Sequence, residues 1–192
     1  MNDATAPTLY PVFLRLAGKD VLVVGAGAVA ERKIQDLVET GAAVRVVALD
    51  PTPAVDALAA SGRIVFARRS FEETDVEGAW LVVAATSDPD VQRRACARAD
   101  RSRTISIAID DPPNGTAYSA SVLRRGPLTV ALSSSGEAPA LMRLLREVIE
   151  QMLPDEGWID AARALRERWR TDDTPMGSRF GELVRAFKER AG

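Results

Sequence analysis

Residues 20–30 read DVLVVGAGAVA. Residues 21–24 are a short, continuously apolar run, which is typical of a strand buried on both faces of a parallel sheet. The run ends at Gly25, where a G-x-G-x-x-A pattern begins. In such a pattern the first glycine permits a tight turn, the second lets the backbone approach a pyrophosphate, and the small last residue lets helix and strand pack closely. The stretch therefore predicts the strand, turn and helix that open a dinucleotide-binding βαβ unit.

The segments that follow continue an alternation of strands and helices. Apolar residues recur at near-helical spacing after the turn (Val29, Ile34, Leu37 and Val38), and Gly41 supplies the stop. We expect further strands at 44–49, 63–67, 79–84 and 104–109, and helices at 55–60 and 88–101. This alternation predicts an α/β fold, a Rossmann-type doubly wound parallel sheet, over the first 110 residues.

The pattern changes at residues 110–115, DDPPNG, a turn-forming cluster that marks a domain boundary. Two strand-like runs at 119–125 and 128–133 then predict a hairpin. A helix to Leu153 follows, with Ser135 as its cap and Pro139 in its first turn. Two more helices are expected, around Trp158–Trp169 and Ser178–Arg190, with Trp158, Ile159, Leu165 and Trp169 in core packing. We expect three regions: a Rossmann domain at 1–115, a small α+β region at 116–153 and a helical region at 154–192.

Composition excludes several classes of function. The 192 residues contain 25 Lys+Arg and 27 Asp+Glu, a net charge of -2, which gives no general attraction to nucleic acid or to an anionic membrane. The absence of histidine removes His-based nucleophiles, proton shuttles and zinc proteases, and the lone Cys96 removes disulfides and thiolate metal cages. No signal sequence or apolar run long enough to span a membrane is present, so we expect a cytoplasmic protein.

Polar residues at the ends of two predicted strands are candidates for cofactor binding. Asp50 stands about 20 residues after the glycine turn, where an acidic residue would accept hydrogen bonds from ribose hydroxyls and disfavour a 2′-phosphate. It therefore favours NAD over NADP, although Asp50 could instead simply start a turn with Pro51. Thr86, after the strand at 79–84, is placed to contact the cofactor, and Ser87 or Asp88 could equally cap the next helix.

Asp110 ends the last predicted parallel strand and so belongs to the same edge of the sheet as Gly25, Asp50 and Thr86. A carboxylate beside a bound cofactor could act as a general base. The alternative is a turn residue, because Asp-Asp-Pro-Pro is strong turn chemistry.

Three blocks of sequence together resemble the precorrin-2 dehydrogenase/sirohydrochlorin ferrochelatase family, which forms the N-terminal module of bacterial sirohaem synthases. The first is YPVFL at 10–14 leading to VVGAGAVAERK at 23–33, and the second is AAT at 84–86. The third is VALSSSGEAPAL at 130–141 with RLLR at 143–146. The resemblance covers about Tyr10 to Leu153.

The resemblance implies an enzyme of sirohaem biosynthesis, an NAD-dependent oxidoreductase that converts precorrin-2 to sirohydrochlorin. In many members of the family a lyase activity also inserts ferrous iron. It implies that Asp110 is catalytic, that residues 116–153 form a dimerisation region, and that the chain is a homodimer with a tetrapyrrole substrate and no protein-held metal. The implied NAD-binding residues are Gly25, Ala26, Gly27, Ala28, Val29, Leu49, Asp50, Ala85 and Thr86. The substrate is a polycarboxylate, and the residues expected to bind it are Asn114, Arg124, Arg125, Ser134 and Arg143, with Arg68, Arg69 and Arg146 as further cations.

The chain departs from the family pattern at three positions. Members commonly have Asn three residues before the catalytic Asp, and an aromatic residue and a Pro further on, where this chain has Ile107, Ala117 and Ala120. These departures favour dehydrogenation over iron insertion as the activity of this chain. Two alternatives stay open: a non-catalytic NAD- or tetrapyrrole-binding protein derived from this family, and an oxidoreductase acting on another anionic substrate.

Overall fold

The computed structural model describes residues 7–153 and 156–191. The chain divides into two compact units. The first comprises the described residues up to Ser119 together with Ser135–Glu137, and the second comprises Ala120–Ser134 and the described residues from Ala138 onward. Within the described ranges, no helix is long and apolar enough to cross a membrane.

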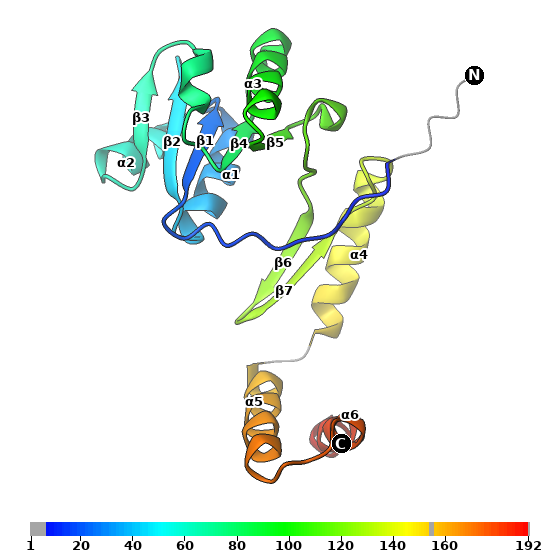
Figure 1. Ribbon diagram of the computed structural model, residues 1–192. Coiled ribbons are helices and arrows are strands. Elements are labelled where there is room, and N and C mark those ends of the chain that lie inside the picture. Colours follow the sequence, from blue (N-terminus) through cyan, green and yellow to red (C-terminus); the bar gives the residue numbers. More distant parts are fainter. Residues whose placement is uncertain (1–6, 154–155, 192) are drawn as a thin grey trace, which may run out of the picture. The chain divides into compact units, whose positions relative to one another are not determined.

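A five-stranded parallel sheet in the order β3-β2-β1-β4-β5 forms the centre of the first unit (Figure 1). The strands are β1 (Asp20–Val24), β2 (Ala43–Ala48), β3 (Val65–Arg68), β4 (Leu81–Ala84) and β5 (Ile105–Ala108). The helices between them are α1 (Ala28–Glu39), α2 (Pro53–Ala60) and α3 (Pro89–Arg101), with short 3-10 turns η1 (Glu73–Val76) and η2 (Pro112–Asn114). The Rossmann-type fold predicted from the sequence is confirmed, and the observed strands begin or end within about two residues of the predicted ones.

Alternate side chains of β1 enter two separate cores. Val21 and Val23 pack with Ile34 of α1 on one face of the sheet. Leu22 and Val24 pack on the other face, where α3 contributes Ala95, Cys96 and Ala99. A strand covered on both faces must be apolar throughout, which explains the unbroken run at 21–24.

Two expectations about individual residues need correction, and one element was not predicted. Val29 is 47% exposed, so the buried face of α1 is formed by Ala30, Ile34 and Leu37 and does not include Val29. Ser135 does not cap α4 (Pro139–Met152): the N-cap is Ala138, whose N–H donates to Ser134 Oγ at 3.0 Å. The turn η1 was not predicted, because its four residues carry no periodic pattern that distinguishes them from a loop.

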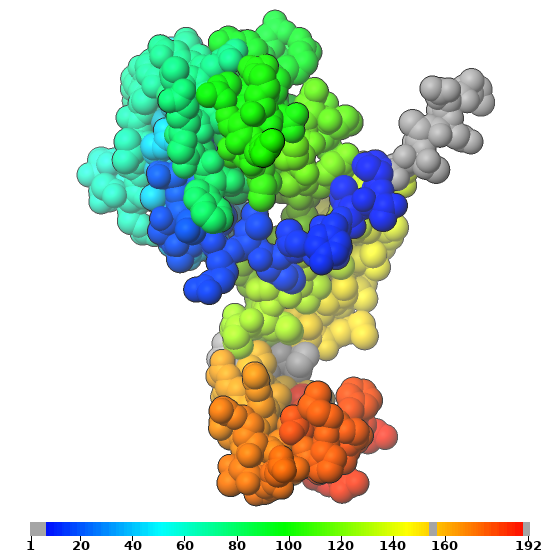
Figure 2. All heavy atoms as spheres, viewed as in Figure 1, coloured from blue at the N-terminus to red at the C-terminus, as the bar shows by residue number. Residues whose placement is uncertain are grey.

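The second unit contains an antiparallel hairpin, β6 (Ser121–Arg125) and β7 (Leu128–Leu132), against which α4 packs through β6. Helices α5 (Glu156–Thr171) and α6 (Met176–Ala191) pack side by side (Figure 2). The rings of Trp158 and Phe187 lie 4.2 Å apart, and buried Trp169 donates its indole N–H to Glu182 at 2.8 Å. The predicted hairpin and the three helices are present, whereas the division into regions at 115 and 153 stays a prediction.

Candidate functional site

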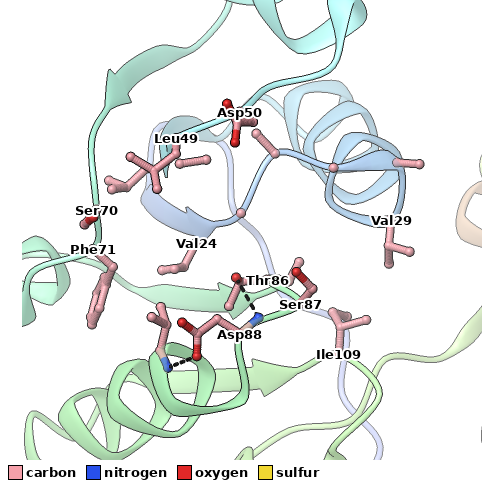
Figure 3. A pocket seen from close by; sticks show the side chains of 18 of the residues that line it. Val24, Val29, Leu49, Asp50, Ser70, Phe71, Thr86, Ser87, Asp88 and Ile109 are labelled. Atoms are coloured by element: carbon pink, nitrogen blue, oxygen red, sulfur yellow. Dashed lines mark hydrogen bonds between the residues drawn. The ribbon is translucent and has the colours of Figure 1, made fainter.

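A cleft of about 580 Å³ opens at the carboxyl ends of the five parallel strands (Figure 3). The chain order reverses between β1 and β4, which is where open α/β sheets bind their ligands. Every strand of the sheet contributes the loop that follows it. The lining residues in these loops are Gly25–Val29 after β1, Leu49 and Asp50 after β2, Arg69–Phe71 after β3, Ala85–Asp88 after β4, and Ile109 and Asp110 after β5.

The two glycines of the fingerprint are required for different reasons. Gly25 has φ +114°, and a Cβ at this position would lie 2.4 Å from the Ala85 carbonyl oxygen, so only glycine lets β1 and β4 meet here. Gly27 has the opposite environment, because a Cβ there would meet nothing within 4 Å. The open space beside Gly27 is the room that a pyrophosphate needs against the backbone.

The N-terminus of α1 supplies to that space peptide N–H groups that have no side-chain cap within the described residues. Gly27 is the N-cap and has no side chain with which to cap the helix. The helical ladder begins with the Glu31 N–H, which donates to the Gly27 carbonyl at 2.9 Å. The peptide N–H groups of residues 28–30 precede that bond, and together with the helix dipole they favour an anion. The residues present therefore fit a dinucleotide.

The position of Asp50 fits the ribose end of such a cofactor. The turn after β2 is held by Thr52, whose N–H donates to the Ala26 carbonyl at 3.0 Å and whose hydroxyl caps α2 by accepting from Val55 N at 3.3 Å. Thr52 therefore supplies two of the hydrogen bonds that hold this turn. Asp50 is exposed in the cleft, and no hydrogen bond or ion pair engages its side chain within the described residues.

Thr86 and Asp88 shape the wall after β4 (Figure 3). The Asp88 carboxylate caps α3 by accepting from the N–H groups of Asp90 and Val91 at 2.9 and 3.2 Å. The Thr86 hydroxyl accepts from the Asp88 N–H at 3.2 Å. Capping therefore falls to Asp88, while Thr86 lines the cleft with Ala85.

Asp110 lies at the cleft edge after β5 in a left-handed backbone conformation, with φ +63°. Asp110 is exposed, and no side chain of the described residues pairs with its carboxylate. Such a conformation costs a non-glycine residue about 1 kcal/mol, so the surrounding contacts must hold it in place. The carboxylate is thus available to a ligand in the same cleft as the fingerprint glycines.

Arg69, Ser70 and Phe71 line the cleft after β3, a place that was not predicted for them from the sequence. Arg69 was expected as a substrate cation on a loop, but its guanidinium forms a two-pronged ion pair with Asp75, at 2.9 and 2.6 Å. Asp75 is 7% exposed and also accepts from the Glu72 N–H at 2.9 Å. The rule that strand ends converge would have placed these residues in the cleft, had it been applied to β3 as well.

The buried Asp75 predicts a pH-dependent contribution to stability. The hydrogen bond from Arg69, together with that from the Glu72 N–H, holds the pKa of Asp75 below its ordinary value of 3.8. A lowered pKa in the folded state stabilises the fold above the pKa of the unfolded chain, and this contribution is lost as pH falls through the folded-state pKa. We expect Asp75→Asn to lower the free energy of unfolding by about 2 kcal/mol at pH 7. Urea unfolding should show this difference constant down to about pH 5 and shrinking below pH 4. An equal difference at every pH would contradict the assignment.

Apart from Arg69, the residues predicted to bind the substrate do not line this cleft, whose lining belongs to the first unit. Asn114 ends η2 and donates its side-chain amide to the Asp111 carboxylate. Arg124, Arg125, Ser134 and Arg143 belong to the second unit. Arg125 donates to the carbonyls of Glu150 and Leu153 at the end of α4, and Arg143 pairs with Glu147 at 3.0 Å. Their role toward a substrate stays a prediction.

Comparison with known proteins agrees with this geometry. A family model described as "Putative NAD(P)-binding" matches residues 12–121. Siroheme synthase 3 of Aeromonas hydrophila is 42% identical over 171 residues, covering 88% of this chain and 36% of that protein. Siroheme synthase of Neisseria meningitidis serogroup C is 37% identical over 189 residues, covering 92% of this chain and 39% of that protein. The chain thus spans less than two fifths of the length of these relatives.

Among solved structures, "SirC, precorrin-2 dehydrogenase" matches with a TM-score of 0.76 and 25% identity, covering 92% of this chain and 88% of that one. The resemblance found in the three sequence blocks is confirmed by these relatives, and the predicted nicotinamide dinucleotide cofactor is confirmed by the family model. The match to the family model, over residues 12–121, includes the whole sheet, the fingerprint glycines and Asp110. On this match, the chain belongs to the NAD(P)-binding family that the family model describes.

Proposed function

We propose that this chain oxidises precorrin-2 to sirohydrochlorin with NAD. The observation that carries the proposal is that the fingerprint glycines, Asp50 and the Asp110 carboxylate, which has no side-chain partner among the described residues, lie together in one cleft. The names of the relatives, siroheme synthase and precorrin-2 dehydrogenase, support this choice of substrate.

The residues of the cleft have distinct roles in this reaction. Gly27 and the first peptide N–H groups of α1 hold the pyrophosphate, and Asp50 accepts hydrogen bonds from the adenosine ribose. Bound NAD supplies the hydride acceptor. Asp110 accepts the proton that leaves the macrocycle, so the substrate loses one hydride and one proton in total.

The decisive experiment is an anaerobic assay with purified protein, NAD and precorrin-2. We expect one NADH to form for each sirohydrochlorin, the two products being followed by their separate absorbance. NAD binding without turnover would instead identify a non-catalytic binding protein. Turnover with other anionic substrates but not with precorrin-2 would identify a different oxidoreductase. Adding ferrous ion after the first step shows in the same cuvette whether iron is also inserted.

Asp50 makes the preference for NAD over NADP testable. A carboxylate at this position repels the 2′-phosphate of NADP. We expect Asp50→Ser to reduce the ratio of NAD to NADP affinity at least about tenfold, mainly by improving NADP binding, because a repulsive contact is removed. Titration of each nucleotide by fluorescence measures the ratio. An unchanged ratio would assign Asp50 to the turn alone.

We further propose that the chain forms a homodimer through α4. One face of this helix is apolar yet open to solvent, with no residue of α4 buried. The residues of this face are Leu141, Leu144, Leu145, Val148 and Met152, all between 37% and 76% exposed. A continuous apolar stripe on a helix indicates an interface, and a second copy of this chain offers the same stripe in a two-fold arrangement.

Leu144→Arg tests the dimer, because it places a charge in the middle of the stripe. We expect the wild-type protein to sediment as a dimer and Leu144→Arg to weaken association at least about a hundredfold, since buried unpaired charges cost several kcal/mol. The matched control is Arg143→Gln, which changes the opposite side of α4 and should leave the dimer intact. A monomeric wild type would refute the proposal.

A further inference from the structure

Gln92 is a buried polar residue of α3 whose side chain reaches the loop that carries Asp110. It is 5% exposed, and its side-chain Nε2 donates to the Ile109 carbonyl oxygen at 3.0 Å. That carbonyl belongs to the peptide group joining Ile109 to Asp110. The hydrogen bond therefore fixes the orientation of the Ile109–Asp110 peptide plane. The φ angle of Asp110 is the rotation of that residue relative to this plane.

Because Asp110 has a left-handed conformation, this hydrogen bond helps to keep its backbone in place. A non-glycine residue with φ +63° relaxes to a commoner conformation unless its neighbouring peptides are held. On the near side, the Ile109 N–H donates to the Ala84 carbonyl at 2.9 Å. On the far side, the Asn114 N–H donates to the Asp111 carbonyl at 3.1 Å. Gln92 supplies the side-chain contact to the peptide between these two points.

The same residue connects Asp110 to the cofactor wall. The Gln92 N–H donates to the Asp88 carbonyl at 3.0 Å, and the Asp88 N–H donates to the Thr86 hydroxyl at 3.2 Å. Thr86, Asp88 and Ile109 border the cleft in Figure 3. A short chain of hydrogen bonds thus runs from the β4 loop, through the first turn of α3, to the peptide that precedes Asp110.

We propose that Gln92 is a positioning residue for Asp110. Gln92 is buried and does not line the cleft, and it holds the Ile109–Asp110 peptide so that the carboxylate keeps its place relative to the β4 wall. The inference rests on the proposed function, since it assigns Gln92 to the proton-transfer step of that reaction.

The test is Gln92→Met, which keeps the length of the side chain and removes its donor. We expect kcat with precorrin-2 to fall about 10- to 100-fold, because displacement of a reacting group by about 1 Å has effects of this size. The KM for precorrin-2 and the Kd for NAD should stay within about threefold, because Asp110 acts in the transition state. Gln92→Leu, which also lacks a donor, should reproduce the effect if the Met variant folds poorly. The matched control is Arg93→Met on the exposed neighbouring position, which should leave kcat unchanged.

A structural readout separates this inference from the proposed function. Crystal structures of the Gln92 variants should show Asp110 outside the left-handed region, whereas Arg93→Met should retain φ near its present value. Wild-type turnover with unchanged kcat and unchanged φ in the Gln92 variants would overturn the inference. A parallel loss of kcat, NAD affinity and melting temperature would also overturn it, because it would mark Gln92 as merely structural. Failure of the wild type to oxidise precorrin-2 would refute the proposed function, and the φ of Asp110 would still decide whether Gln92 holds the turn.

Discussion

Asp110→Ala is expected to lower kcat with precorrin-2 about a thousandfold while the Kd for NAD stays within about twofold. The Asp110 carboxylate lies at the cleft edge in the loop after β5, with no side-chain partner among the described residues, and a positioned general base contributes about 10²- to 10⁴-fold to a rate. NAD affinity should be preserved because the pyrophosphate and ribose contacts come from the loops after β1 and β2, on the other side of the switch point.

The matched control for this experiment is the neighbouring carboxylate. Asp111 precedes η2, does not line the cleft, and accepts a hydrogen bond from the Asn114 side chain. We expect Asp111→Asn to keep kcat within about threefold, since it removes a charge next to Asp110 without removing the base. Steady-state NADH formation gives kcat, and quenching of protein fluorescence by NAD gives Kd. A fully active Asp110→Ala enzyme would remove Asp110 from the mechanism.

The part of the fold that could be predicted from sequence is the part that depends on local pattern and burial. The run at 21–24 must serve two cores, one formed with α1 and one with α3, so its apolar character is unambiguous. The function of the fingerprint could be predicted because its small residues stand where a larger side chain would not fit. At Gly25, for example, a Cβ would lie 2.4 Å from the Ala85 carbonyl oxygen.

Features that depend on tertiary contact could not be predicted. Helical spacing alone gives Val29 as a core residue, whereas it lines the cleft, where only the family resemblance had placed it. Periodicity does not distinguish the edge of an apolar face from a ligand-binding wall. The bond from Gln92 to Ile109 joins residues that are 17 positions apart, and a lone glutamine in a helix carries no signal of its partner. Ser135 resembles a cap, but its φ of +53° places it outside the helix that it was expected to begin.

Substitution by alanine should have different effects at the two fingerprint glycines: a loss of stability at Gly25 and a loss of NAD affinity at Gly27. Gly25→Ala would force a Cβ to 2.4 Å from the Ala85 carbonyl at a φ of +114°. We expect this to lower the free energy of unfolding by about 2–5 kcal/mol, through steric overlap and backbone strain together. At about 2–4 °C per kcal/mol for a chain of this size, the melting temperature should fall by about 10 °C.

Gly27→Ala should lower the melting temperature by no more than about 4 °C, because a Cβ there meets nothing within 4 Å and only the modest preference of an N-cap for glycine over alanine is lost. The added methyl group occupies the space that the pyrophosphate requires, so NAD affinity should fall about 10- to 100-fold, the equivalent of one or two lost charge-assisted hydrogen bonds. Thermal unfolding without ligand and calorimetric titration with NAD measure the two effects separately. Each variant serves as the control for the other, since both add one methyl group two residues apart. If Gly27→Ala bound NAD as tightly as the wild type, the pyrophosphate could not lie against Gly27, and the cofactor would have to be placed elsewhere in the cleft.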